Sequence, residues 1–230
     1  WRRGEISSMA CLRRQWRTFY PTEAEALAFV DGLEVDPDFL ALLALARTRG
    51  TGIAILSDGL DFYLDRMFAN LGLRTCGDDS CLRATDCLLR FSNAATFGPD
   101  GLRIEFPYCN ACGQCGNCKV EHLFRLRRSA TRVIYLGDGW STVGDDSLTE
   151  IEGRLARRGG GIPRLGAVAL GPVAHRALLS ALTRNRGPLL GALDGEDAPA
   201  SAVELLQELA VPAVSGVVLD LGPNVERVYP

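Results

Sequence analysis

The stretch from residue 38 to residue 71 most constrains the fold, because its pattern predicts a helix, a strand and a second helix joined by short loops. The first helix has an apolar face at the helical period and ends near Gly50. Residues 52–59 predict a short buried strand that breaks at a glycine, and residues 60–71 predict the next helix, which Gly72 ends. This alternation is typical of a parallel sheet covered by helices, so we expect an α/β fold.

The rest of the chain adds elements of the same kinds. Residues 91–106 predict a hairpin of two strands around a Gly-Pro-Asp-Gly turn. A helix at 120–128 and a strand at 132–136 restore the α/β alternation. Beyond residue 150 the pattern weakens; it favours helices at 172–184 and 201–210 and a last strand at 214–221.

Composition sets the class of protein. The 230 residues are 47% hydrophobic and 23% charged, which is ordinary for a soluble globular chain. A formal net charge of −3 gives no reason to expect nucleic acid or an anionic membrane as a partner. No apolar run approaches the length of a membrane span. Eight cysteines without an apolar signal-peptide core indicate a reducing compartment, so we expect a cytoplasmic protein.

Four of the cysteines are spaced by strict two-residue gaps: Cys109, Cys112, Cys115 and Cys118. Such density favours a zinc site, although zinc is usually held by two separated Cys-x-x-Cys pairs. An iron–sulfur cluster is disfavoured, because the last gap is short and Lys119 follows where proline is usual. Reduced structural thiols and oxidised Cys-x-x-Cys pairs are the alternatives.

Other potential metal ligands show less pattern. Cys76, Cys81 and Cys87 are separated by five and six residues, a spacing that matches no common ligand motif. His122 follows Cys118 by one helical turn. Its position suits either a further ligand of a metal site or a half-buried histidine on a helix.

Polar residues stand at three positions where open α/β sheets place ligands. Ser57, Asp58 and Gly59 end the strand at 52–59, where a hydroxyl and helix-start N–H groups suit a phosphate, or simply a capped turn. Lys119 opens a helix, a place where the helix dipole favours an acid instead. Asp138 ends an apolar run between two glycines, which suits a Mg²⁺ ligand or a turn.

The order and spacing of four segments resemble the haloacid-dehalogenase-like (HAD) phosphatases. These segments are ILSDGLDFYLDRMF (55–68), IEFP (104–107), CGNCK (115–119) and VIYLGDG (133–139). The resemblance covers roughly residues 5–140. Within the superfamily it is greatest to the branch that contains 2-hydroxy-3-keto-5-methylthiopentenyl-1-phosphate phosphatase of methionine salvage and phosphoserine-phosphatase-like enzymes.

The resemblance implies a fold and a domain organisation. We expect a HAD-like core with a Rossmann-like parallel sheet at 37–145, which includes the hairpin at 91–106 and the cysteine-rich loop at 109–118. Residues 1–36 would form a partial helical cap. Residues 146–230 would form an α/β tail outside the resemblance.

The resemblance also implies Mg²⁺-dependent hydrolysis of a small phosphorylated metabolite. Ser57, Asp58, Gly59 and Lys119 would bind the phosphate, and Asp138 would bind Mg²⁺. Lys119 and Asp138 would be the catalytic residues. These roles agree with the needs of phosphoryl transfer, which are mainly positioning and charge neutralisation.

The sequence departs from the family in two places. No DxDx(T/V) motif, the source of the family's nucleophile, precedes Ser57. Four residues after Asp138, where the family has a second aspartate, stands Thr142, and the nearest acids are Asp145 and Asp146. We therefore expect a chain that lacks part of the catalytic set.

Three explanations of this departure stay open: a truncated product of an active family, a degenerate member that binds without catalysis, and a permuted chain in which residues 217–222 replace the missing motif. The alternative function is a zinc- or redox-linked binding module on a degenerate phosphatase scaffold. A third alternative is a non-catalytic scaffold, such as a homo-oligomer, that associates through the apolar helices of the tail.

Overall fold

The computed structural model describes residues 6–18, 21–84, 86–109, 115–126, 132–139, 149, 153, 164–184, 187–192 and 197–210. The chain divides into two compact units. The first comprises Trp1–Ala130 and Trp140–Gly159, and the second Thr131–Gly139 and Gly160–Pro230. Each unit has its own sheet and its own core.

Strand β3 (Cys87–Gly98) is the centre of the four-stranded sheet in the first unit. Its first half pairs in parallel with β1 (Ala54–Leu60) on one side and β2 (Arg74–Cys76) on the other. Its second half forms an antiparallel hairpin with β4 (Gly101–Glu105). One long strand therefore belongs to both the parallel part and the antiparallel part of the sheet.

The described helices of the first unit are α1 (Ser8–Arg17), α2 (Glu23–Asp31), α3 (Pro37–Thr48), α4 (Asp61–Asn70) and α5 (Lys119–Leu126), with the 3₁₀ helix η1 (Asp79–Arg83). Side chains cap the N-termini of α2 and α3. Thr22 and Glu25 form a capping box at α2, each accepting a backbone N–H of the other. Asp36 caps α3, and proline occupies the first turn of that helix.

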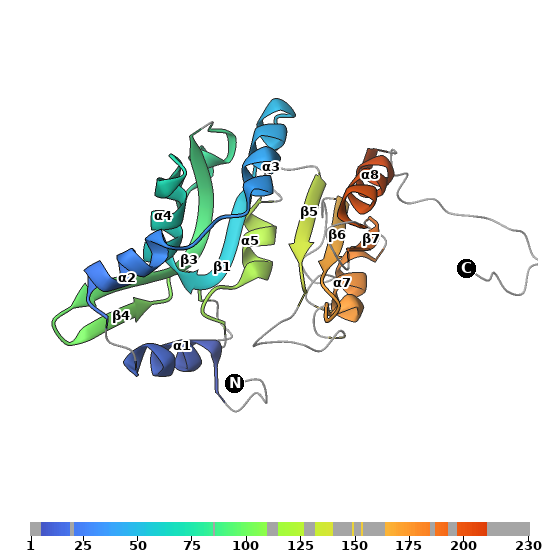
Figure 1. The fold of residues 1–230 in the computed structure, drawn as a ribbon. Helices are drawn as coiled ribbons and strands as arrows, with labels where there is room; N and C mark the ends of the chain where they lie inside the picture. The colour runs from blue at the N-terminus through green and yellow to red at the C-terminus, as the bar shows by residue number, and fades with distance from the viewer. Residues whose placement is uncertain are drawn as a thin grey trace, which may run out of the picture. The chain divides into compact units, whose positions relative to one another are not determined.

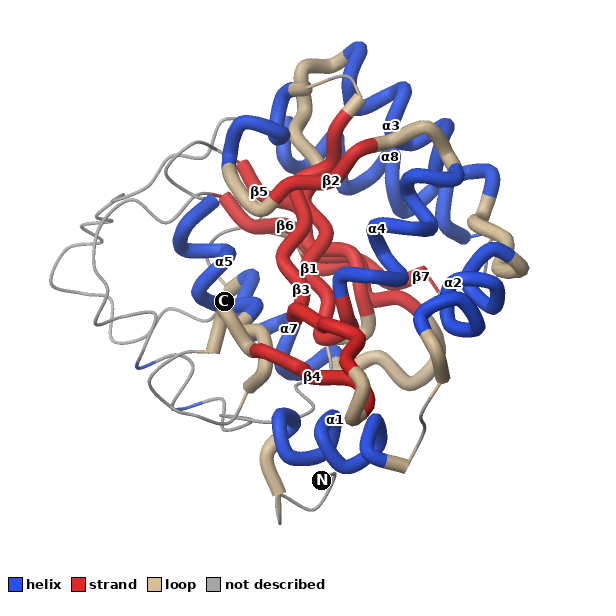
Figure 2. Tube along the Cα trace, turned by 90° about the vertical axis from the view of Figure 1, so that its left-hand side faces the viewer, coloured by secondary structure: helices blue, strands red, loops and turns tan. Residues whose placement is uncertain are grey.

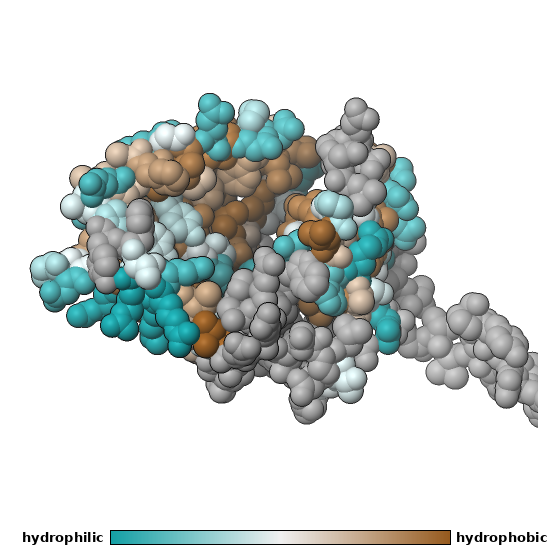
Figure 3. Space-filling view, turned by 60° about the horizontal axis from the view of Figure 1, so that its bottom comes forward, coloured by the Kyte–Doolittle hydropathy of each residue, from teal (hydrophilic) through white to brown (hydrophobic). Residues whose placement is uncertain are grey.

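Helix α1 lies beside β4 in both views of the chain (Figure 1 and Figure 2). Its solvent side is hydrophilic (Figure 3), with Arg13, Arg14 and Arg17 exposed. Its first residue, Ser8, is buried and accepts a hydrogen bond from the backbone N–H of Gly116 at 2.9 Å. The helix is therefore joined to the segment that leads into α5.

Both faces of the parallel strands are covered by helices, and α4 and α5 lie on opposite sides of β1 and β3 (Figure 1). Leu89 and Phe91 of β3 pack on the face that contains α5 and η1. Leu88, which directly precedes Leu89, packs on the opposite face with α3 and α4. Burial on two faces is typical of parallel sheets in α/β proteins.

The second unit has a three-stranded parallel sheet in the order β5 (Arg132–Gly137), β6 (Arg164–Leu170), β7 (Leu189–Ala192). Helix α7 (Arg176–Thr183) packs on one side of β6, and α8 (Asp197–Ala210) packs on the other. This unit is thus a second small sheet with a helix on each face.

The structure confirms an α/β fold with parallel strands. The expected helix, strand and helix at 38–71 correspond to α3, β1 and α4. The sequence did not indicate β6 or β7. The strand expected at 132–136 is β5, and it pairs with β6 instead of with a strand of the first unit.

The expected division into residues 1–36, 37–145 and 146–230 stays a prediction, as does a HAD-like core with a partial cap. The expected strand at 214–221 lies outside the described residues. Among the described helices, none has the length and apolar character that a membrane span requires.

Candidate functional site

The predicted phosphate loop, residues 57–59, forms an irregularity at the end of β1. Leu56 is aligned with Phe91 and Leu60 with Asn93, so four residue steps along β1 match two along β3. Such a bulge interrupts the ladder and re-aims side chains. Helix α4 starts directly after β1 and has no side-chain N-cap. The loop therefore presents polar atoms beside a helix start, where anions are favoured.

The Ser57 hydroxyl is held inside this loop. It accepts a hydrogen bond from the Gly59 N–H at 3.0 Å. The Tyr63 side chain also hydrogen-bonds to Ser57, and a Cβ atom at position 59 would collide with the Tyr63 hydroxyl. Burial raises the pKa of Tyr63, so its phenol stays protonated near neutral pH. Glycine at 59 is thus needed for the close approach of this ring.

Two buried asparagines hold the backbone of the loop. Asn93 donates through Nδ2 to the carbonyl oxygen of Asp58 at 2.6 Å. Asn117 donates through Nδ2 to the carbonyl oxygens of Ser57 and Phe91, both at 2.7 Å. The loop carbonyls thus have fixed donors in the interior, where an unmade hydrogen bond is costly. The loop is preorganised before any ligand binds.

His122 supports Asn117 from α5. Its Nε2 lies 2.5 Å from Asn117 Oδ1, and its ring stacks on Phe91 with a centroid separation of 4.1 Å. Burial lowers the pKa of His122 to about 4, with a further lowering by Arg125 and a smaller opposing effect of Glu121. Because Asn117 Oδ1 can only accept, the neutral imidazole donates through Nε2.

Lys119, the single lysine of the chain, begins α5. Its Nζ lies 3.7 Å from Asp58 Oδ2, and the two side chains are 39% and 34% exposed. Asp58 Oδ1 is buried and has no hydrogen-bond partner among the described residues. The loop therefore combines the solvent-accessible ammonium of Lys119 with the carboxylate of Asp58, which can accept a further hydrogen bond. A phosphate would compete with Asp58 for Lys119, whereas a cation would bind the carboxylate.

Asp138 follows β5 in the second unit. Its side chain is exposed, and its carbonyl oxygen accepts the His175 N–H at 2.7 Å. Gly139 has a φ of 70° and would direct a Cβ atom against Leu179. This tight turn holds the aspartate at the end of its strand. Positions 142, 145 and 146 lie outside the described residues.

The cysteine-rich loop is described in part. Cys118 is buried and donates its N–H to the carbonyl oxygen of Tyr108 at 3.2 Å, while Cys109 and Cys115 are half-buried. Cys112 lies outside the described residues. A four-cysteine zinc site at 109–118 therefore stays a prediction.

The first unit brings residues 57–59 and Lys119 together, and Asp138 belongs to the second unit. Sequence reasoning missed Asn93, Asn117 and Tyr63. A signal existed for the two asparagines: Asn93 interrupts the apolar run of β3, and Asn117 stands within the CGNCK segment. An uncharged amide in a buried strand requires hydrogen-bond partners, which here are the loop carbonyls.

The chain is similar to the 2-hydroxy-3-keto-5-methylthiopentenyl-1-phosphate phosphatase of Exiguobacterium sibiricum, with 30% identity over 117 residues. The matched region covers 48% of the chain and 48% of that protein, so the chain spans about half the length of this curated relative. The chain matches no protein-family model.

Proposed function

We propose that the chain binds small phosphomonoesters and acts in their Mg²⁺-dependent hydrolysis, as a HAD-type protein with a Rossmann-like core at 37–145 and a partial helical cap at 1–36. The observation that carries this proposal is the preorganised loop at 57–59 with the accessible Lys119 beside it. The similarity to a phosphatase of methionine salvage supports a small phosphorylated metabolite as the ligand.

The proposed roles follow from the chemistry of each group. The Ser57 hydroxyl and the N–H groups at the start of α4 would donate to phosphoryl oxygens. Lys119 would neutralise negative charge on the phosphate as it is transferred. Asp58 transfers no proton in this scheme. Its carboxylate holds Lys119 near the loop when no phosphate is bound.

An exposed carboxylate suits Mg²⁺, which prefers oxygen ligands. The carboxylate of Asp138 is exposed at a strand end and is the proposed ligand. When bound, Mg²⁺ would supply charge neutralisation at the phosphoryl group.

The test separates binding from turnover, because no DxDx(T/V) motif precedes Ser57 in the sequence. Lys119 offers the only ε-amine, so an amine-directed reagent labels this side chain and the α-amino group alone. We expect inorganic phosphate to slow labelling of Lys119, measured by peptide mass spectrometry, and to leave labelling of the α-amino group unchanged. Equal labelling of Lys119 with and without phosphate would contradict the proposal.

Turnover is measured with a panel of small phosphomonoesters in the presence of Mg²⁺ or EDTA. Phosphate release that requires Mg²⁺ and is lost in Lys119→Ala and in Asp138→Asn would support hydrolysis by this chain. Protection of Lys119 without any phosphate release would identify a binding protein on a phosphatase scaffold instead. A second candidate, a metal- or redox-linked module, is favoured by the convergence of Cys76, Cys81 and Cys87.

A further inference from the structure

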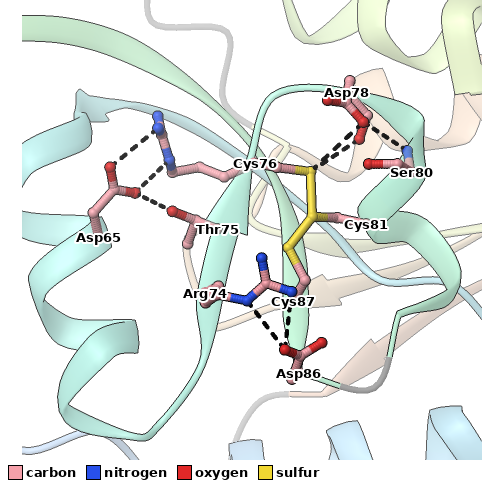
Figure 4. Close-up of a disulfide and its surroundings, with 10 residues drawn as sticks. Asp65, Arg74, Thr75, Cys76, Asp78, Ser80, Cys81, Asp86 and Cys87 are labelled. Carbon is pink, nitrogen blue, oxygen red and sulfur yellow. Dashed lines mark hydrogen bonds and ion pairs between the residues drawn. A yellow bond between two sulfur atoms is a disulfide. The ribbon is translucent and has the colours of Figure 1, made fainter.

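Three cysteines come together on one side of the first unit's sheet, although their spacing in the sequence matches no common ligand motif. Cys76 ends β2, Cys81 lies in η1 and Cys87 begins β3. Their Sγ atoms all lie within 4.8 Å of one another (Figure 4). Cys81 and Cys87 are buried and Cys76 is half-buried, so the sulfurs meet at the border of the core.

The convergence involves all three sulfurs at once. The Sγ of Cys81 is in bonding contact with the Sγ of both Cys76 and Cys87. A divalent sulfur forms a single disulfide, so a disulfide would use two of the cysteines and leave the third beside it. One metal ion bound by all three sulfurs accounts for the position of each of them. We propose that Cys76, Cys81 and Cys87 bind one zinc ion as thiolates.

The ligand chemistry suits this ion, and all three sulfurs lie within 4.8 Å of one another. Zinc–sulfur bonds of about 2.3 Å in a tetrahedron separate the sulfurs by roughly 3.8 Å, so the Sγ atoms of Cys76 and Cys87 would each move away from that of Cys81 when the ion binds. Soft thiolate ligands favour zinc over Mg²⁺ or Ca²⁺. Three thiolates leave one position of a tetrahedral zinc site for an oxygen ligand.

Asp78 is the proposed fourth ligand. Its Oδ1 lies 4.0 Å from the Sγ of Cys76 and also caps η1 by accepting the Ser80 N–H at 2.8 Å (Figure 4). An aspartate carboxylate can bind the ion through one oxygen.

Charge favours the site as well. Three thiolates and a carboxylate around Zn²⁺ carry net negative charge, and Arg125 acts electrostatically on Asp78. A cavity of about 330 Å³ is bordered by Cys81, Cys87 and Arg47. The Nη2 atom of Arg47 is buried and has no hydrogen-bond partner among the described residues. Arg47 thus lines the same cavity as two of the three cysteines.

The ion would have a structural role. Cys76, Cys81 and Cys87 come from the two ends and the middle of the β2–η1–β3 connection. Its ends are already joined by the Arg74 N–H, which donates to the Asp86 carbonyl oxygen at 2.8 Å, and by the Arg74–Asp86 ion pair at 2.9 Å (Figure 4). Zinc would fix η1 between these ends, and its binding would add directly to folding stability.

The test is the zinc content of the full chain, purified without chelators and with thiols kept reduced. We expect Cys81→Ser and Cys76→Ser each to lose about one equivalent of zinc relative to the unmodified chain, since a structural site needs its full ligand set. Cys11→Ser, a change at a half-buried cysteine of α1, is the matched control and should keep all of it. Unchanged zinc in both cluster variants would overturn the proposal.

A second measurement does not depend on the folding of the cluster variants. The variant with serine at 109, 112, 115 and 118 keeps the proposed site and removes the other cysteine cluster. X-ray absorption of its zinc should show three sulfur neighbours at about 2.3 Å and one oxygen at about 2.0–2.2 Å. A metal-free product with a disulfide at Cys81, found by mapping peptides after the thiols are blocked at lysis, would also overturn the proposal.

Discussion

The side-chain amide of Asn117 lies 2.7 Å from the carbonyl oxygen of Ser57 and donates a hydrogen bond to it. The same amide donates to the carbonyl oxygen of Phe91 in the central strand. Asn117 also stands two residues before Lys119, where α5 begins. One buried side chain therefore sets the positions of the predicted phosphate loop and of the lysine together, relative to the sheet that carries both.

Asn117→Ala should destabilise the first unit strongly. The change leaves the carbonyl oxygens of Ser57 and Phe91 without this donor, at about 1–3 kcal/mol for each unsatisfied buried group. Urea unfolding measures the loss. Asn70→Ala is the matched control, because Asn70 is exposed and donates to the exposed Asp31, so we expect a change within about 0.5 kcal/mol. Equal losses in the two variants would contradict the role given to Asn117.

His122 should make the stability of the chain depend on pH between about 6.5 and 4. Its pKa is lowered to about 4 in the folded chain, whereas an unfolded histidine titrates near about 6.5. Within this window the unfolded chain binds a proton that the folded chain does not. The free energy of unfolding therefore falls as the pH falls, by a total on the order of 3 kcal/mol.

The measurement is urea unfolding at several pH values from 7 to 4.5, for the unmodified chain and for His122→Gln. Glutamine can still donate to Asn117 but does not titrate, so this part of the pH dependence should disappear. The lowered pKa values of Asp31, Asp78 and Asp86 act at more acid pH, because ordinary aspartates titrate near about 3.9. The same slope in both proteins would rule out His122 as its source.

Lys119→Ala should change stability little and phosphate binding greatly. The Lys119–Asp58 pair is more than one-third exposed on both sides, and exposed ion pairs contribute about 0–1 kcal/mol. Lys119 is nevertheless the single lysine of the sequence, and its ammonium group lies at the loop. Phosphate-dependent shifts in unfolding temperature should be present in the unmodified chain and absent in the variant. Arg74→Ala removes an exposed cation paired with Asp86 and should keep those shifts.

The sequence predicts the elements that local pattern determines. Glycines separate helix α3 from strand β1, Gly59 stands near the end of β1, and the three elements carry distinct apolar periods, so each can be recognised without its neighbours. The expected strand broke at Gly59, and β1 ends at Leu60. The bulge within β1 was not expected, because it depends on pairing with β3 and leaves no local pattern.

Strand β6 shows why the second unit was harder to predict. Its sequence, RLGAVAL, consists mainly of small apolar residues, a composition that suits a buried helix as well as a strand. Gly166 is required by packing, because a Cβ atom there would lie 2.9 Å from Leu205 of α8. Such contacts join residues far apart in the chain. The approach of Cys76, Cys81 and Cys87 has the same origin, since it follows from the pairing of β2 with β3.

Gly59→Ala should destabilise the loop through a steric conflict with Tyr63. A Cβ atom at position 59 would overlap the Tyr63 hydroxyl and lie 2.6 Å from the ring carbon that carries it. Overpacking of this kind costs about 1–3 kcal/mol, since the ring or the backbone must move. We expect that loss in urea unfolding, together with weaker protection of Lys119 by phosphate, because the loop backbone would shift.

A double-mutant cycle identifies the cause of the loss. Tyr63→Leu shortens the side chain that approaches Gly59, so Gly59→Ala should cost less in the Tyr63→Leu background. Gly98→Ala is the matched glycine control, because the nearest atom to its Cβ would be the Gly101 carbonyl oxygen at 3.5 Å. That control should stay within about 0.5 kcal/mol of the unmodified chain. If Gly59→Ala costs the same in both backgrounds, the conflict lies in the backbone of the loop and not with the Tyr63 ring.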